Sequence, residues 1–242
     1  MIGLGTIVNV AAVLVGGGLG LLVRGGIPKR VENILMQALG LSTIVVGLSG
    51  TLKEMLVIKD GALSVQGTML MILSLVIGGL IGELCRIEHH MERLGDYVKK
   101  KVGAQNDAHF TEGFVTATLI ICVGAMAIVG SLQDGLTGDA STLYIKALLD
   151  GVLLIVLAST LGVGTLFSAL PLGLYQGGIT LCAAFAAPLM SERLISNLSL
   201  VGSVLIAVIG YNVAFKKHFS PANLLPALLG PVVAEVFFCI FS

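Results

Sequence analysis

The feature that most constrains this chain is an apolar stretch near its middle, from Phe114 to Gly135, with the sequence FVTATLIICVGAMAIVGSLQDG. A helix of about 20 apolar residues is long enough to cross the hydrocarbon core of a bilayer. An inert anchor could consist of Leu, Ile and Val throughout, whereas this stretch also carries Thr116, Thr118, Gly124, Gly130 and Ser131. Small and weakly polar residues permit close helix packing or a wet interior. We therefore interpret the chain as a polytopic membrane protein, with a transporter or channel as the first functional hypothesis.

The composition also favours a membrane over an aqueous environment. Of the 242 residues, 56% are hydrophobic and 12% are charged, and the mean hydropathy is +1.01, whereas a soluble domain has about 25% charged residues. The formal net charge is zero, which argues against a nucleic-acid partner. The four cysteines lie within or beside apolar runs without a CxxC pair. We therefore expect no disulfide, no metal site and no cofactor.

The apolar runs predict an all-α integral membrane protein, a bundle of about eight transmembrane helices. The runs cover residues 3–23, 33–51, 67–85, 114–135, 142–163, 165–190, 194–215 and 221–241. With both termini outside, the loops that face the cytoplasm hold ten Lys and Arg residues and the outer loops hold three, in agreement with the positive-inside rule. Fusing the fifth and sixth runs gives seven helices as the alternative number.

The sixth run is expected to be a broken helix. Pro171, Gly173 and the Gln176-Gly177-Gly178 sequence all fall inside it. Backbone groups that a break releases at membrane depth need a wet cavity or protein cover. This places the exposed backbone near Gly177 and Gly178, together with Gln176, among the candidate solute ligands.

A polar segment, residues 86–109, is predicted to hold a cytoplasmic amphipathic helix on the membrane surface. Its apolar residues recur at helical spacing, namely Ile87, Met91, Leu94 and Val98, and charged residues occupy most other positions. The neighbouring His89 and His90 are candidate ligands of a metal site. Adjacent side chains on a helix point in different directions, so a solvated face is the simpler interpretation.

Two matching segments suggest an internal repeat. Residues 77–84, IGGLIGEL, align with residues 229–236, LGPVVAEV, and this alignment matches Glu83 with Glu235. Helices 1–3 thus resemble helices 6–8, and the odd offset makes the repeat inverted, as in many secondary transporters. The match is gapped, and a chance alignment of glycines is the alternative. The single domain, 1–242, then divides into a first repeat (1–85), the surface helix (86–109), a central helix pair (110–164) and a second repeat (165–242).

Ionisable and amide side chains inside the runs are the candidate ligands of a solute or ion. They are Glu83, Asp150, Glu235, Asn9, Gln176, Gly177 and Asn212. A charge at membrane depth costs about 2.5–3.5 kcal/mol on insertion scales, so it tends to face a cavity or a partner. Each has a simpler interpretation as well. The glutamates could reach an interface, Asp150 could pair with Lys146 one turn away, and the amides could join helices.

Several runs carry a family resemblance over essentially the whole chain. The quoted runs are GTIVNVAAVLVGGGLGLL, ILMQALGLSTIVVGLSG, the central CVGAMAIVGSLQDG and NLLPALLG. They resemble the YqgA/YdfK-like family of bacterial multi-pass membrane proteins. That resemblance implies a location in the bacterial plasma (inner) membrane and a domain of unknown function that is often discussed as a transport protein. It assigns no role to any individual residue.

Three classes of function can be weighed against each other. A transporter or channel for a small solute or ion, with its site at the repeat interface near the bilayer midplane, is favoured by the glycine-rich helices and the intramembrane carboxylates. A structural or regulatory membrane scaffold, with the surface helix as a docking or lipid-binding element, is the alternative. An enzyme is not expected, because the runs hold no histidine and no HExxH or GxSxG motif. The expected partners are the lipid bilayer and an unknown solute or ion, and a homodimer through a GxxxG face is a further expectation.

Overall fold

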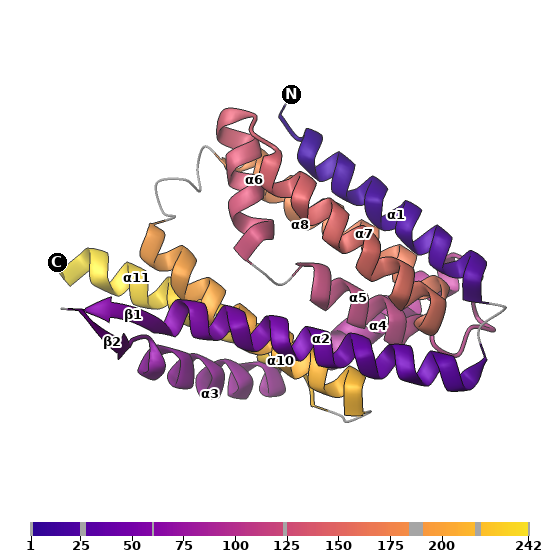
Figure 1. Cartoon of the computed structure of the whole chain (residues 1–242), viewed down its shortest axis with the longest axis horizontal. Coiled ribbons are helices and arrows are strands. Elements are labelled where there is room, and N and C mark those ends of the chain that lie inside the picture. The colour runs from indigo at the N-terminus through magenta and orange to yellow at the C-terminus, as the bar shows by residue number, and fades with distance from the viewer. Residues whose placement is uncertain are drawn as a thin grey trace. The chain divides into compact units, whose positions relative to one another are not determined.

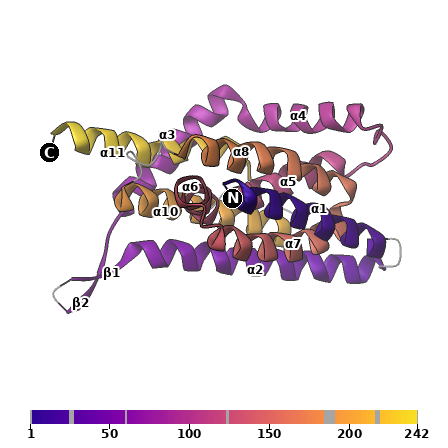
Figure 2. The ribbon, with the colours of Figure 1, turned by 90° about the horizontal axis from the view of Figure 1, so that it is seen from above.

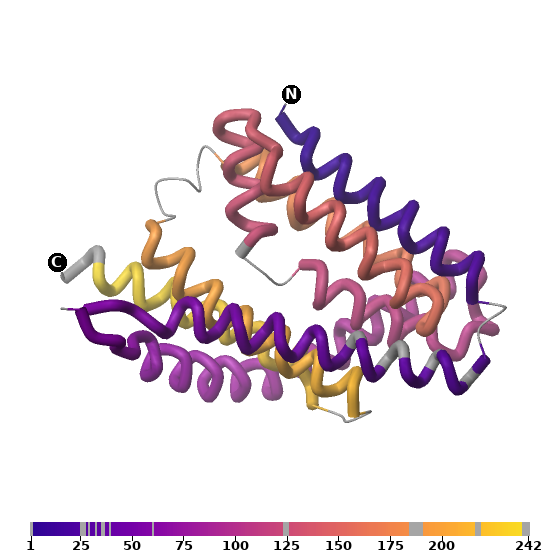
Figure 3. Tube along the Cα trace, in the orientation of Figure 1, coloured from indigo at the N-terminus to yellow at the C-terminus, as the bar shows by residue number. Residues whose placement is uncertain are grey.

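The apolar runs fold into helices close to the limits that the sequence predicts. The computed structural model describes residues 2–24, 28–59, 61–122, 125–183, 191–215 and 219–241, and Figure 3 shows the path of the chain. Its elements (Figure 1) are α1 (Leu4–Arg24), α2 (Lys29–Met55), β1 (Leu56–Lys59), β2 (Ala62–Val65), α3 (Thr68–Cys85), α4 (Ile87–Lys101), α5 (Phe110–Cys122), α6 (Ala125–Thr137), α7 (Ser141–Leu161), η1 (Val163–Ser168), α8 (Ala169–Leu181), α10 (Glu192–Phe215), η3 (Ala222–Leu228) and α11 (Leu229–Phe241), where η marks a 3-10 helix. The all-α prediction is confirmed for the described residues, apart from the two short strands.

The chain divides into two units that alternate along the sequence. Unit 1 comprises Met1–Leu39, Met91–Cys122 and Met126–Leu189, and unit 2 comprises Gly40–His90, Val123–Ala125 and Met190–Ser242. Unit 1 therefore holds α1, α5, α7, η1 and α8, with nearly all of α6 and most of α4. Unit 2 holds most of α2, the β-hairpin, α3, α10, η3 and α11.

Helices α1 and α7 form the long contact of unit 1, and they run side by side in Figure 1. The approach is close because Gly16 and Gly20 of α1 face the backbone of α7. A Cβ added at Gly16 would overlap the carbonyl oxygen of Gly151, and one at Gly20 would overlap that of Ile155. The GxxxG pair thus serves close helix packing within the chain.

The break in the sixth apolar run lies earlier than the sequence predicts. Helix α8 continues through Pro171 and through Gly177 and Gly178, so the prediction of a break there is wrong. Pro171 is the third residue of α8, and a proline in the first turn disrupts no hydrogen bond of the helix. The irregular backbone is instead η1, which follows Gly162 with a φ of 84° that favours glycine. Residues 184–190 of this run lie outside the described residues.

The central run is also interrupted. Helices α5 and α6 are bent by 61° relative to each other, so the stretch is a broken span or a re-entrant loop rather than one straight helix. A bend of this size leaves the last carbonyl groups of α5 without partners in a continuing helix. The ends of this pair therefore need other hydrogen-bond partners, which bears on the site described below.

Unit 2 pairs helix α3 with the 3-10 helix η3. Gly78 and Gly82 of α3 face the η3 backbone, where added Cβ atoms would overlap Ala227 and Asn223. A β-hairpin precedes α3, with Leu56 opposite Val65 and Lys59 opposite Ala62, and it extends beyond the end of α2 in Figure 2. The sequence interpretation as a loop missed this hairpin, although the Asp60-Gly61 dipeptide between short apolar segments is a hairpin signal.

Many large apolar side chains of the long helices are exposed. Examples in α3 are Ile72, Val76, Leu80 and Leu84, and soluble proteins rarely expose contiguous apolar surfaces of this kind. Within the described residues, four helices are long and apolar enough to cross a membrane, α1, α3, α7 and α10, and the bent α5–α6 pair makes up to five.

The segment predicted as an amphipathic surface helix is helical, and it forms α4. Gly95 is buried and faces Thr111 and Phe114 of α5, while charged residues including Arg93, Lys100 and Lys101 are exposed and mark the solvated face. Of the apolar residues that the sequence spacing singled out, Ile87, Met91 and Val98 are half-buried and Leu94 is exposed.

Candidate functional site

A buried ion pair lies at the middle of α7. Lys146 and Asp150 stand one turn apart, and the ammonium of Lys146 donates to Oδ2 of Asp150. Each residue is only 6% exposed. Asp150 falls near the centre of the 21 residues of a candidate span, where reaching an interface is not open to it. The simpler interpretation of Asp150 as the partner of Lys146 is thus confirmed, and the pair sits deep in the helix bundle of unit 1.

Two buried amides complete this cluster. Nδ2 of Asn9, from α1, donates to Oδ2 of Asp150 at 3.0 Å and to Oε1 of Gln176, from α8, at 3.2 Å. Both amide residues are 0% exposed. The close packing of α1 on α7 brings Asn9 to the ion pair. The structure therefore joins Asn9, Asp150 and Gln176, three of the residues that the sequence singles out.

Two polar atoms of the cluster make no hydrogen bond to any residue that the structure describes. Oδ1 of Asn9 and Nε2 of Gln176 are buried and have no hydrogen-bond partner among the described residues. One of these atoms is an acceptor and the other is a donor. Burying such a group unpaired costs about 1–3 kcal/mol, so the pair of atoms is suited to a small molecule that both donates and accepts.

The other partner of Lys146 is the broken central span. Its Nζ donates to the backbone carbonyl of Ile121 at 2.8 Å, and Ile121 is the second-last residue of α5. The last carbonyls of a helix have no partner within it and carry the negative end of the helix dipole. A cationic side chain there satisfies one such carbonyl and links α7 to the end of α5.

Apolar side chains enclose the cluster on its neighbouring turns. Val13 of α1, Leu154 and Leu157 of α7 and Leu172 of α8 belong to one fully buried core. The hydroxyls of Thr6 and Thr180 lie 3.5 Å apart and extend the polar contacts between α1 and α8. A polar cluster inside an apolar core experiences a low dielectric, which strengthens each of its hydrogen bonds.

A buried carboxylate that the candidate residues did not include orders the start of α1. Asp134, 0% exposed, accepts hydrogen bonds from the backbone N–H of Gly3 at 3.2 Å and of Gly5 at 3.1 Å. A carboxylate satisfies the free N–H groups of a helix N-terminus and its positive dipole end. Asp134 belongs to the CVGAMAIVGSLQDG run, and it fixes the helix that carries Asn9.

Three of the remaining candidate residues, Glu83, Asn212 and Glu235, have partners within unit 2, whereas Gly177 belongs to unit 1. Glu83 accepts a hydrogen bond from Nδ2 of Asn223 at 2.8 Å, and Glu235 accepts one from the hydroxyl of Ser191. Asn212 bonds the backbone of Phe219 through both ends of its amide. Gly177 lies beside Gln176 in α8, with no atom within 4 Å of an added Cβ. These residues join helix ends and turns rather than forming one polar cluster.

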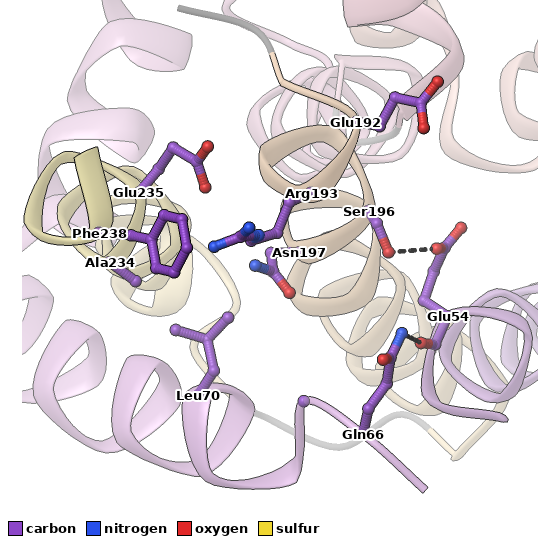
Figure 4. A pocket seen from close by; sticks show the side chains of 11 residues that line it. Glu54, Gln66, Leu70, Glu192, Arg193, Ser196, Asn197, Ala234, Glu235 and Phe238 are labelled. Atoms are coloured by element: carbon purple, nitrogen blue, oxygen red, sulfur yellow. Dashed lines mark hydrogen bonds between the residues drawn. The ribbon is translucent and has the colours of Figure 1, made fainter. Parts of the chain in front are cut away.

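Unit 2 contains a half-open cavity of about 610 Å³. Figure 4 shows it between α10, α11, the end of α2 and the start of α3. Ser196 donates to Glu54 at 2.6 Å, and the Arg193 guanidinium lies 3.6 Å from the centre of the Phe238 ring. One oxygen of Glu235 has no partner in the described part of the chain. The cavity reaches solvent, in contrast to the closed cluster of unit 1.

An ion pair at the end of α1 stabilises the turn into η1. Nη1 of Arg24 donates to Asp107 at 3.2 Å, and the guanidinium lies against Gly162. Burial alone would raise the pKa of Asp107, but hydrogen bonds from Arg24 and from the backbone N–H of His109 outweigh it and hold the pKa below its ordinary value. Asp107 is therefore a carboxylate at neutral pH.

The arrangement in unit 1 combines charged groups with hydrogen-bonding groups. It offers a paired charge, a free acceptor and a free donor, all enclosed by helices that are apolar on the outside. Over the described ranges, no group of three or more His, Cys, Asp or Glu side chains is arranged to hold a metal ion. The fold and this cluster together define a class, a helical membrane protein with a polar cluster buried among its apolar helices.

Comparisons with known proteins place the chain in a family of unknown function. Residues 4–236 match the family described as "Protein of unknown function (DUF554)", and the chain belongs to that family. It is 34% identical over 229 residues to "Uncharacterized membrane protein YdfK" of Bacillus subtilis (strain 168), covering 95% of this chain and 94% of the relative. It is 29% identical over 233 residues to "Uncharacterized protein YqgA" of Escherichia coli (strain K12), with 93% of each chain covered. No solved structure gives a significant match. The resemblance to the YqgA/YdfK-like family is thus confirmed.

Proposed function

We propose that this chain is a multi-pass protein of the bacterial plasma membrane that moves a small polar solute or an ion. The observation that carries the proposal is the cluster of Asn9, Lys146, Asp150 and Gln176, each at most 6% exposed, at the centre of apolar helices. Ionisable residues at such depth are costly, and in membrane proteins they mark ion and substrate paths. A protein that only anchored or spaced other proteins would have no use for these charges.

The free hydrogen-bonding atoms indicate the solute. Since Lys146 and Asp150 neutralise each other, the site offers no net charge to an incoming molecule. It offers an acceptor, Oδ1 of Asn9, and a donor, Nε2 of Gln176. A small uncharged molecule with a hydroxyl or an amide can satisfy both atoms. Solute binding at these two amides is therefore part of the proposal.

The proposal also retains eight membrane-embedded segments. Residues 34–52 of α2 carry no charged side chain, which supports a further span. The η1–α8 and η3–α11 segments supply the sixth and eighth as helices that begin with an irregular turn. Irregular backbone of this kind is tolerated in membranes where protein or a wet cavity covers it.

An internal duplication supports a transporter. In each unit a long helix leads through a 3-10 segment into a 13-residue helix whose third residue is proline: α7, η1 and α8 with Pro171, and α10, η3 and α11 with Pro231. The sequence suggests a different pairing, an inverted repeat of helices 1–3 and 6–8, and that repeat stays a prediction. Repeats with broken helices are the architecture of many secondary transporters.

The test is a flux assay in proteoliposomes. Purified protein is reconstituted, and the uptake of urea, glycerol, small amides, protons, Na⁺ and K⁺ is followed in turn. Flux of at least one species is expected for the wild type, and Gln176→Ala or Asp150→Asn should abolish it in protein that remains folded. Glu83→Gln and Glu235→Gln are matched carboxylate controls in unit 2 and should retain it.

Two outcomes would contradict the proposal. Wild-type vesicles that pass none of these species would favour the scaffold alternative, with α4 as its docking surface. Full flux in folded Asp150→Asn and Gln176→Ala variants would remove the cluster from the path. The homodimer stays a prediction as well, although Gly16 and Gly20 already pack against α7 within the chain and are not available to a second copy.

A further inference from the structure

Two oxygen atoms accept hydrogen bonds from the buried Lys146 ammonium. Oδ2 of Asp150 accepts one of its hydrogen bonds, and the carbonyl oxygen of Ile121 accepts another at 2.8 Å. Asn9 holds the same Asp150 oxygen from the side of α1 at 3.0 Å. The ammonium is thus a buried cation held by one carboxylate oxygen and one carbonyl oxygen, at the C-terminal end of helix α5.

These two oxygen atoms are of the kind that a hard cation binds. Carbonyl and carboxylate oxygens are the ligands that hard cations prefer. In transporters with broken helices, the C-terminal ends of half-helices and their free carbonyls coordinate Na⁺ or a proton carrier at membrane depth. Helix α5 ends in this way at the 61° bend before α6, and Ile121 supplies the carbonyl of its last turn.

We propose that the Lys146 ammonium occupies a monovalent-cation site built from Asp150, the Ile121 carbonyl and the α5 helix end. The ammonium of Lys146, which is covalently part of the chain, takes the place of an alkali ion there. The inference rests on the proposed function only where it concerns the coupling of solute flux to an ion. Because Lys146 supplies the cation, wild-type flux requires neither Na⁺ nor K⁺. The site itself is a property of unit 1 that does not depend on transport.

The competing interpretation is an ordinary ion pair between Lys146 and Asp150. Both interpretations expect the loss of Lys146 to destabilise the protein, because it leaves the carboxylate of Asp150 buried without a counter-charge. They differ in what restores stability. A cation site accepts an alkali ion in the space that Lys146 leaves, whereas an ordinary ion pair collapses or fills with water and gains nothing from a particular ion.

The experiment is thermal unfolding of full-length protein in detergent, in KCl, NaCl and choline chloride of equal ionic strength. For Lys146→Ala we expect the melting temperature to be higher in KCl or NaCl than in choline chloride by about 5–10 °C, the shift that a specifically bound ligand at 100 times its Kd produces in a protein of this size. Wild-type protein should melt at the same temperature in all three salts.

Three variants control the measurement. Lys146→Met fills the space with an apolar chain and should show no difference between salts, and Lys146→Ala/Asp150→Asn lacks the anionic ligand and should show none. Lys146→Ser places a hydroxyl oxygen at the cavity and serves where Lys146→Ala does not fold. The same salt dependence is expected for Lys146→Ser. Equal melting temperatures of the folded Ala or Ser variant in all three salts would overturn the inference.

The outcome is separable from that of the flux assay. Alkali-dependent stability of Lys146→Ala in a protein without measurable flux would keep the cation site and remove the transport function. Flux in the wild type without alkali-dependent stability of the variant would keep transport and remove the cation site. A wild-type melting temperature that rises in KCl or NaCl as much as that of the variant would overturn the inference too, because an occupied site cannot take a second cation.

Discussion

The two units use similar elements but differ in what they bury. In both, a long helix is followed along the chain by a 3-10 segment and a 13-residue helix, and glycines of another helix lie against the 3-10 segment or the long helix. Among the side chains that the structure describes, the charged residues that are buried are Asp134, Lys146 and Asp150, all in unit 1. Unit 2 buries Thr43, Ser74, Ser203 and Asn223 instead.

This difference shows which buried groups the fold requires for stability and which it does not. Unit 2 shows that a uniformly uncharged interior supports this set of elements. A buried ion pair is weak evidence of stability, because the cost of removing both charges from water offsets their attraction. The cluster of Asn9, Lys146, Asp150 and Gln176 is therefore best explained by function. The following changes test that comparison, from the largest expected effect to the smallest.

The largest effect is expected from removing one charge of the buried pair. Asp150→Ala leaves the Lys146 ammonium buried without a counter-charge and should lower the free energy of unfolding by about 3–5 kcal/mol. Glu235→Gln, a carboxylate change in unit 2, should cost no more than about 1 kcal/mol. Unfolding by SDS titration in mixed micelles measures both. Equal losses would mean that the two units do not differ in the way the burial suggests.

The next effect concerns the close packing that the two units share. Gly16→Leu in unit 1 and Gly78→Leu in unit 2 place side chains against the backbones of α7 and η3, and each should cost about 1–3 kcal/mol or more. Gly18→Leu is the control, since no atom lies within 4 Å of its added Cβ. The same titration applies, and a Gly16→Leu variant as stable as Gly18→Leu would show that α1 and α7 are not in close contact.

A smaller effect is expected at the helix start that Asp134 holds. Asp134→Ala removes the acceptor of two backbone N–H groups of α1 and should cost about 1–2 kcal/mol. Asp139, which accepts from the backbone N–H and hydroxyl of Ser141 at the start of α7, is solvent-exposed, and Asp139→Ala should cost less. Hydrogen exchange at the first turn of α1 should quicken only in Asp134→Ala. Unchanged exchange there would contradict the capping role.

The smallest effect is the acid dependence from the Arg24–Asp107 pair. The pKa of Asp107 in the folded state lies below its ordinary value of 3.8. Its contribution is therefore fully present above that value and is lost as the pH falls through the folded-state pKa. Because Arg24 is 35% exposed at its side chain, we expect no more than about 1 kcal/mol. In the Asp107→Asn variant, this part of the pH dependence of the free energy of unfolding should be absent between pH 5 and pH 2. A pH dependence equal to that of the wild type would mean that other groups cause it.

The sequence predicts most helix limits because the apolar runs are long. Helices α1, α3, α7 and α10 begin and end within about two residues of the predicted runs. The break in the sixth run was misplaced because Pro171 looks disruptive in the sequence but lies in a first turn, where it is tolerated. Gly162 reveals its role only through its positive φ. The hairpin between α2 and α3 was missed because its strands have four residues each.

The sequence identifies residues of the cluster as candidates, but it does not predict that they lie in contact. A polar residue in an apolar run stands out at once, which is why Asn9, Asp150 and Gln176 were candidates, as were Glu83, Glu235 and Asn212. Which of them converge depends on how α1, α7 and α8 pack, and a single sequence holds no record of contacts between distant segments. The carbonyl of Ile121 is a backbone group that no residue pattern indicates.

The most direct test of a functional cluster is the flux of a variant in which unit 1 lacks its buried ion pair. Lys146→Met/Asp150→Leu replaces the buried pair by apolar side chains, a change that is often neutral or stabilising. We expect this variant to fold, to unfold no more easily than the wild type, and to pass none of the solutes or ions that wild-type proteoliposomes pass. Wild-type flux through the folded double variant would show that the buried charges serve neither transport nor the path of the solute.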